Sequence, residues 1–273
     1  MNSNIVDDKF AVYFKYNVQN LPPKLINSTR FIVLSDTHNR VFSIPDGDIL
    51  IHAGDLTALY DVNFDITAKW LLACQIKTKV IVAGNHDLML LRSGKPHSDG
   101  SWDVSYTDDY DPQAIDSLCG DIGVSNGLYY LQNTVKQVHS CGRTWRILGS
   151  PLYPSRRPTK HTATQALKTV SRFEPMDVLI THGPPHNILD KTQSNLNVGC
   201  VELTDALPRL RPKLHVFGHI HESRGCKVVW HDDESYTIHI NAANSRVFGR
   251  YNGESDHDDD ELNAVIVDIV NDY

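Results

Sequence analysis

Five short apolar runs, each followed at once by a polar cluster, constrain what this sequence can fold into more than any other feature. The runs are rich in Val, Ile and Leu, as buried strands are. They cover residues 30–35, 49–53, 79–83, 177–181 and 213–217. Segments with a helical spacing of apolar residues lie between them, at 62–76, 161–170 and 200–210. Strands that alternate with helices predict a layered α/β fold.

Every run is followed by a side chain that can bind a metal ion. In chain order these side chains are Asp36 and His38, Asp55, Asn85, His182, and His219 and His221. Because α/β folds gather their binding sites at the carboxyl ends of strands, we expect all of these side chains to converge. A lone aspartate or histidine at a strand end is more often a turn or core-edge residue. The ordered set favours a metal site.

The predicted ligands combine carboxylate oxygens, imidazole nitrogens and one amide oxygen, without a thiolate. Such a mixed set suits manganese, iron or zinc, and ligand softness alone does not choose among these metals. The set exceeds what one tetrahedral site needs, but it suits two ions that share a bridging carboxylate. Two ions about 3.5–4 Å apart can clamp a phosphoryl group and deprotonate a water molecule.

Short alternating segments in the second half of the chain predict a second sheet packed against the first. They lie at 228–230 and 236–240, and a final apolar strand is expected at 264–270. A polar, turn-rich insertion occupies 92–112, and the acidic residues of 252–261 indicate a solvated loop.

Composition supports one domain over residues 1–273, with its core at about 30–270, because 41% of the residues are hydrophobic. A net charge of −7 creates no field that attracts a nucleic-acid backbone, so no specific nucleic-acid binding is expected. The five cysteines are scattered and form no CxxC pair, which indicates reduced thiols. No apolar stretch resembles a secretory leader or a membrane span, so we expect a soluble, cytoplasmic protein without membrane association.

The polar clusters match a known pattern. The sequence resembles the calcineurin-like metallophosphoesterases, whose blocks read D-x-H, G-D, G-N-H-D, a lone H and G-H-x-H. Here the blocks are Asp36-Thr37-His38, Gly54-Asp55, Gly84-Asn85-His86-Asp87, His182 and Gly218-His219-Ile220-His221. The surrounding segments VLSDTHNR, LIHAGDLT, LGSPLYP and LHVFGHIHE are similar to the metallophosphoesterase-domain-containing subgroup, which is linked to class III cyclic nucleotide phosphodiesterases.

This resemblance implies an αββα sandwich of two mixed sheets flanked by helices, with a dimetal site at the carboxyl ends of strands. It assigns the ligands to two divalent ions bridged by Asp55. One ion takes Asp36, His38 and His221, and the other takes Asn85, His182 and His219. Manganese is favoured, with iron, zinc or magnesium as alternatives.

The resemblance also implies a catalytic role for His86, either as the general acid or as a group that steadies the phosphoryl oxygens. Asp87 is expected to set the tautomer of that imidazole. The glycines before the ligands, Gly54, Gly84 and Gly218, are expected to allow close backbone approach or tight turns.

Several further residues have two interpretations. Arg40 is a candidate substrate contact, and His186 is equally a substrate contact or a loop residue. Arg156 and Arg157 are candidate phosphate contacts, although a solvated face is favoured for them. His52 lies inside an apolar run, which favours a hydrogen-bonded core histidine over a residue that supports a metal ligand.

The predicted reaction is hydrolysis of a phosphodiester by a hydroxide held between the two ions, with a cyclic nucleotide as the favoured substrate. One alternative is a phosphomonoesterase or protein phosphatase on the same centre. The other is a scaffold protein of low activity that keeps the metal fold. The sequence leaves the oligomeric state open.

Overall fold

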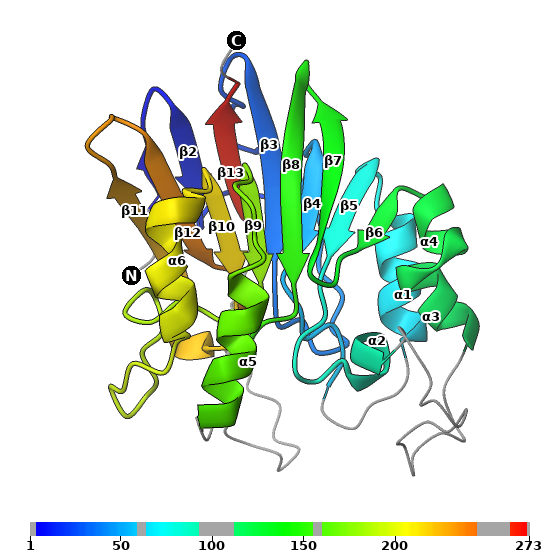
Figure 1. The fold of residues 1–273 in the computed structure, drawn as a ribbon. Helices are drawn as coiled ribbons and strands as arrows, with labels where there is room; N and C mark the ends of the chain where they lie inside the picture. Colours follow the sequence, from blue (N-terminus) through cyan, green and yellow to red (C-terminus); the bar gives the residue numbers. More distant parts are fainter. Residues whose placement is uncertain (1–3, 59–63, 93–111, 155–159, 245–262, 272–273) are drawn as a thin grey trace.

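Two β-sheets pack face to face and form the body of the molecule (Figure 1). A computed structural model describes residues 4–58, 64–92, 112–154, 160–244 and 263–271. The first sheet has seven strands, in the spatial order β1 (Ile5–Val6), β2 (Phe10–Tyr13), β13 (Val265–Val270), β3 (Ser28–Leu34), β4 (Ile49–His52), β5 (Thr78–Ile81) and β6 (Leu128–Tyr130).

The second sheet has six strands. Their spatial order is β11 (Gly225–Trp230), β12 (Tyr236–Asn241), β10 (Leu214–Phe217), β9 (Val178–Thr181), β8 (Arg143–Ser150) and β7 (Thr134–Ser140). Both sheets are mixed. In the first, β3 to β6 pair in parallel, while β1, β2 and β13 form antiparallel pairs. In the second, β8, β9, β10 and β12 pair in parallel, while the edge strands β7 and β11 pair antiparallel with their neighbours. The carboxyl ends of β3 and β8 point to the same, lower end of the sandwich (Figure 1).

Alternation along the strands explains how the layers assemble. In β3, Phe31 and Val33 lie in the core between the sheets, whereas Ile32 and Leu34 lie in the core beneath the helices. In the core between the sheets, Trp145 of β8 packs edge-on against Phe31 of β3, with ring centroids 4.9 Å apart. A strand with both faces buried must be apolar throughout, which is why the runs were recognisable in the sequence.

Helices cover the outer faces of both sheets (Figure 1). The seven-stranded sheet carries α1 (Asp65–Ala73), α2 (Leu88–Arg92) and α3 (Pro112–Cys119), and α4 (Asp121–Ser125) follows α3 beside β6. The six-stranded sheet carries α5 (Lys160–Val170) and α6 (Val201–Leu210). A short 3₁₀ turn, η2 (His221–Ser223), follows β10. The predicted αββα architecture is thus confirmed.

The five apolar runs are all strands, but they divide between the sheets. Runs 30–35, 49–53 and 79–83 become β3, β4 and β5, while 177–181 and 213–217 become β9 and β10. Sequence reasoning missed β1, β2, β6 and the hairpin of β7 and β8. It also missed the short helices α2, α3 and α4.

Some predictions lie beyond what the structure describes. Residues 93–111 of the polar insertion and residues 245–262, which include the acidic loop, fall outside the described part of the chain. That the whole chain makes one domain stays a prediction. Among the described residues, no helix is both long and apolar enough to cross a membrane.

Candidate metal centre

The carboxyl ends of strands from both sheets bring three groups of metal-binding side chains together. In each group, one ligand atom of every member lies within 4.8 Å of the ligand atoms of the others. The groups are Asp36, His38 and His221; Asp55, His182 and His219; and His38, Asp55 and His86. His38 and Asp55 each belong to two groups, so the groups form one continuous cluster.

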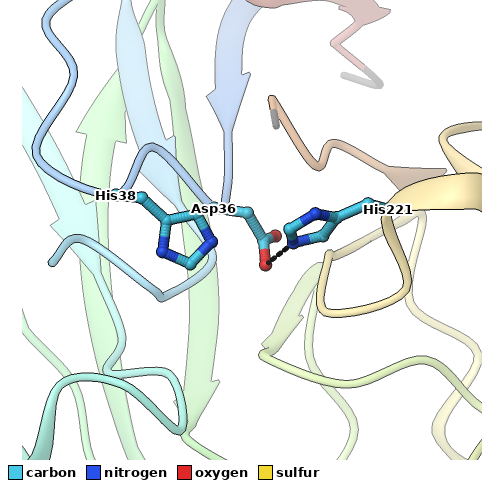
Figure 2. A group of neighbouring side chains, drawn as sticks. All are labelled: Asp36, His38 and His221. Carbon is cyan, nitrogen blue, oxygen red and sulfur yellow. Dashed lines mark hydrogen bonds and ion pairs between the residues drawn. The ribbon is translucent and has the colours of Figure 1, made fainter. Parts of the chain in front are cut away.

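The first group joins the two sheets. Asp36 and His38 follow β3 of one sheet, and His221 begins the η2 turn after β10 of the other. Figure 2 shows the two imidazoles on either side of the Asp36 carboxylate. The Nε2 atom of His221 lies 3.0 Å from Oδ1 of Asp36, and the two imidazole rings lie 5.5 Å apart.

Backbone carbonyls orient two of the imidazoles, His182 and His38. The Nδ1–H of His182 donates to the Ala53 carbonyl over 2.9 Å. The Nε2 atom of His182 therefore faces the site, 3.4 Å from Oδ1 of Asp55 and 3.0 Å from Oδ1 of Asn85. His38 is held in the same way, since its Nδ1–H donates to the Thr57 carbonyl over 3.1 Å. An outer hydrogen bond of this kind fixes the tautomer and ring orientation of a metal-binding histidine.

Several of these residues have strained backbones. Asp36, His38, Asp55 and His219 have φ angles of +56°, +46°, +52° and +68°. Left-handed backbone is unfavourable for residues with a Cβ atom, by an amount on the order of 1–3 kcal/mol each, and it tends to cluster at functional sites. The tight loops after the strands thus hold unfavourable conformations at the residues that point into the cluster.

Glycines make room beside the cluster, as the sequence predicted. Gly54 has a φ of +97°, and a Cβ atom at this position would lie 2.7 Å from Nδ1 of His182. A Cβ atom on Gly218 would collide with Oδ2 of Asp36. Only a hydrogen atom fits at either position without displacing a proposed ligand.

His86 is a member of the cluster, and Asp87 follows it in the chain. His86 is 7% exposed, and its Nε2 atom lies 3.8 Å from Oδ2 of Asp55. The buried Asp87 carboxylate accepts hydrogen bonds from the backbone N–H groups of Leu56, Thr57 and Gly84, at 2.8–3.1 Å. Asp87 thus joins its own loop to the loop of Leu56 and Thr57. Its expected effect on the tautomer of His86 stays a prediction.

Electrostatics keep the carboxylates of Asp36 and Asp55 ionised. Burial alone would raise the pKa of Asp36, but the hydrogen bond from His221 and the nearby imidazoles outweigh it and hold the pKa below its usual range. For Asp55, burial is likewise outweighed by His182, which lowers the pKa of the carboxyl. The charge of Asp55 in turn outweighs burial at His182 and raises the pKa of that imidazole to about 9. A cation bound at its Nε2 atom would replace this proton.

The donor set fits divalent cations. Carboxylates and imidazoles are ligands for manganese, iron and zinc. A bound cation would also offset the free-energy cost of burying the carboxylate charges. The positions of the side chains suit adjacent ions, because Asp55 and His38 are shared between groups.

Two of the predicted substrate contacts, Arg40 and His186, lie among the described residues, and both are at least partly exposed. Arg40 is exposed and donates to the Asn244 carbonyl over 2.8 Å. The side chain of His186 is one-third exposed, and its Nδ1 atom lies 3.5 Å from the buried Asp190 carboxylate. Whether either residue contacts substrate stays a prediction. Arg156 and Arg157 lie outside the described residues.

Sequence reasoning missed Tyr153. This side chain follows β8, is partly exposed, and places its ring 5.6 Å from that of His219 and 6.0 Å from that of His182. Burial, and then the charge of Asp55, raise the pKa of its phenol, so the hydroxyl group is a neutral donor. An aromatic residue beside Pro154, next to the segment 155–159, gives no periodic signal that could have singled it out.

The fold and the cluster together define a metal-binding α/β protein whose site can hold adjacent cations. Residues 29–223 match the family model described as calcineurin-like phosphoesterase, so the chain belongs to that family. Membership supports metal-dependent hydrolysis of phosphate esters.

Similar proteins agree with this assignment. Human metallophosphoesterase domain-containing protein 1 is 32% identical over 235 residues, which covers 81% of this chain and 68% of that protein. A UPF0046 protein of Caenorhabditis elegans is 29% identical over 240 residues, covering 81% of this chain and 77% of its own length. One solved structure aligns with a TM-score of 0.50 at 14% identity, over 78% of this chain and 90% of that one, and shows likeness of fold alone.

Proposed function

We propose that this protein hydrolyses phosphodiesters, with cyclic nucleotides as the favoured substrates, at a centre of two divalent metal ions. The observation that carries the proposal is the membership of Asp55 in two of the three ligand groups, since a shared carboxylate is what two adjacent ions require. The preference for diesters rests on the resemblance of the sequence blocks to class III cyclic nucleotide phosphodiesterases.

In this proposal, Asp36, His38 and His221 would hold one ion, Asn85, His182 and His219 would hold the other, and Asp55 would serve both. Manganese is the favoured metal, and iron, zinc and magnesium remain alternatives. When bound, two such ions supply a deprotonated water molecule at neutral pH and offset the negative charge of the phosphate.

The side chains of the protein carry the other roles. His86 lies beside Asp55 and His38, where its imidazole can donate a proton to the leaving oxygen or a hydrogen bond to a phosphoryl oxygen. Asp87 holds the loop of His86 in place through the backbone of Leu56 and Thr57. Fixed donors of this kind stabilise developing charge without having to reorganise during the reaction.

The test is a comparison of manganese-dependent turnover of a diester and a monoester that share one leaving group, followed by a 3′,5′-cyclic nucleotide. Faster diester turnover supports the proposal. Faster monoester turnover would support a phosphomonoesterase or protein phosphatase instead. A protein that binds both ions and turns over neither substrate would support a scaffold role.

A second measurement tests the centre itself. Asp55→Ala and His219→Ala are expected to lose bound metal and activity together, because Asp55 belongs to two of the ligand groups and His219 completes one of them. Metal content by atomic emission and turnover are measured on the same samples. If activity survived either substitution, the proposed centre would be wrong.

A further inference from the structure

His52 lies between the two loops that carry most of the ligands from the first sheet. It is the last residue of β4 and is fully buried. Its Nε2 atom lies 3.0 Å from Oγ1 of Thr37. Its Nδ1 atom lies 3.3 Å from the backbone nitrogen of Gly54. One imidazole therefore touches both the D-x-H block and the G-D block.

These two contacts determine which ring nitrogen of His52 carries the proton. A backbone N–H can only donate, so the Nδ1 atom that faces Gly54 must accept and cannot carry a proton. The proton of the neutral ring then sits on Nε2, from which it is donated to the hydroxyl oxygen of Thr37. A single neutral tautomer of His52 satisfies both contacts.

The residues that His52 contacts are the neighbours of proposed ligands. Thr37 stands between Asp36 and His38, and Gly54 precedes Asp55. The two loops are also joined by backbone bonds, from Asp36 N–H to the Gly54 carbonyl (2.9 Å) and from His38 N–H to the Asp55 carbonyl (3.1 Å). Because all three ligands have positive φ angles, their conformations need support from surrounding contacts.

The second sheet has a corresponding arrangement. The Thr181 hydroxyl donates to the Gly183 carbonyl over 2.7 Å, so its oxygen accepts from Nε2 of the buried His215, 2.9 Å away. Thr181 directly precedes His182, just as Thr37 is adjacent to Asp36 and His38. In each sheet, a buried histidine is hydrogen-bonded to a threonine that is next to a proposed ligand in the chain.

We propose that His52 is a positioning residue that joins the Asp36–His38 loop to the Asp55 loop and so sets the affinity of the centre for metal. The inference rests on the proposed ligand set and assigns His52 a task beyond filling the core. Groups that hold metal ligands from outside typically contribute about 10- to 100-fold in metal affinity.

The experiment measures Mn²⁺ binding to the chelator-treated full chain by titration with electron paramagnetic resonance detection, which gives both stoichiometry and affinity. His52→Phe keeps a ring of similar shape but loses both hydrogen bonds, and is expected to weaken Mn²⁺ binding by about 10-fold or more. Thr37→Val removes only the acceptor for Nε2 and is expected to have a smaller effect.

Two conservative variants separate the contacts. The amide of His52→Gln reaches the place of Nε2 and can still donate to Thr37. The amide oxygen of His52→Asn lies near the place of Nδ1 and can still accept from Gly54. Each is expected to recover part of the affinity, and His52→Gln is expected to lose its advantage over His52→Phe when Thr37→Val is also present.

A control separates positioning from general destabilisation. Val267→Ala, in the centre of β13 and within the same sheet, removes buried side-chain volume away from the cluster. It is expected to lower thermal stability without changing Mn²⁺ affinity. If His52→Phe bound Mn²⁺ as tightly as the wild type, or if Val267→Ala weakened binding equally, the inference would be overturned. A wild-type chain that bound no Mn²⁺ would instead overturn the proposed function, and the inference with it.

Discussion

Replacing Gly218 by alanine tests whether close packing around Asp36 sets up the metal centre. Gly218 follows β10, and its φ angle lies outside the left-handed region, so alanine can adopt its backbone conformation. The added Cβ atom would nevertheless collide with the Asp36 carboxylate and lie 2.7 Å from Cβ of Ser35. Strain from this substitution therefore comes from crowding alone.

The size of the effect follows from the contacts that must give way. Overpacking a filled interior costs about 1–3 kcal/mol. If Asp36 moves, it weakens its bonds with the His219 backbone N–H, at 3.0 and 3.2 Å, and with His221. A hydrogen bond to a charged group contributes about 1.5–3 kcal/mol, and about 1.4 kcal/mol corresponds to a factor of ten in binding. We expect Mn²⁺ affinity to fall by about tenfold or more.

The assay combines thermal unfolding in a chelator with Mn²⁺ titration of the same preparations. Gly142→Ala is the matched control, because its φ of +78° is unfavourable for alanine while nothing lies within 4 Å of the added Cβ atom. This control is expected to lose about 1–2 kcal/mol of stability and to bind Mn²⁺ normally. Wild-type stability and affinity in Gly218→Ala would refute the packing argument.

Three further outcomes are expected. Asp268→Ala removes one partner of the buried, two-bond pair with Arg30 (2.7 Å for each bond), and thermal or urea unfolding should show a loss of about 3–5 kcal/mol. Burial lowers the pKa of His239 in the folded chain to about 3. On acidification, the unfolded chain therefore protonates this imidazole near pH 6.5, whereas the folded chain does so only near pH 3. The contribution of neutral His239 to stability is therefore fully present above pH 6.5 and is lost on acidification. In His239→Phe, the free energy of unfolding measured in urea should depend less steeply on pH in that window, by up to about 1.4 kcal/mol per pH unit. Tyr153→Ala loses ring contacts worth about 0.5–1.5 kcal/mol, so its Mn²⁺ affinity should fall by about 2- to 10-fold while Tyr153→Phe stays near wild type; equal affinities in both variants would contradict this.

Local patterns in the sequence were enough for much of the fold. A strand buried on both faces leaves a continuous apolar run, so β3 and β9 were visible within a few residues of their bounds. The hairpin of β7 and β8 was missed because β7 is largely exposed and has only two apolar residues, Val135 and Val138, which are three positions apart. The short strands β1 and β2 were missed because β2 pairs with β13, which lies at the other end of the chain, and β1 pairs with β2.

The division of the runs between two sheets could not be deduced from the runs themselves. Parallel strands bury both faces whichever sheet they join, and so β5 and β9 have the same local signature. Only the packing of side chains such as Trp145 on Phe31 shows which strands face each other across the core.

The sequence by itself determined which residue types stand at the strand ends, and this was enough to nominate Asp36, Asp55 and His182 as members of one site. The number of residues between each strand and the residue that follows it is a local property, and it can be taken directly from the sequence. Tertiary structure alone decided how they meet: which carbonyl turns His182 toward Asp55, and which imidazole joins the loops. Those contacts link residues far apart in the chain, and their geometry exists only once both sheets have packed.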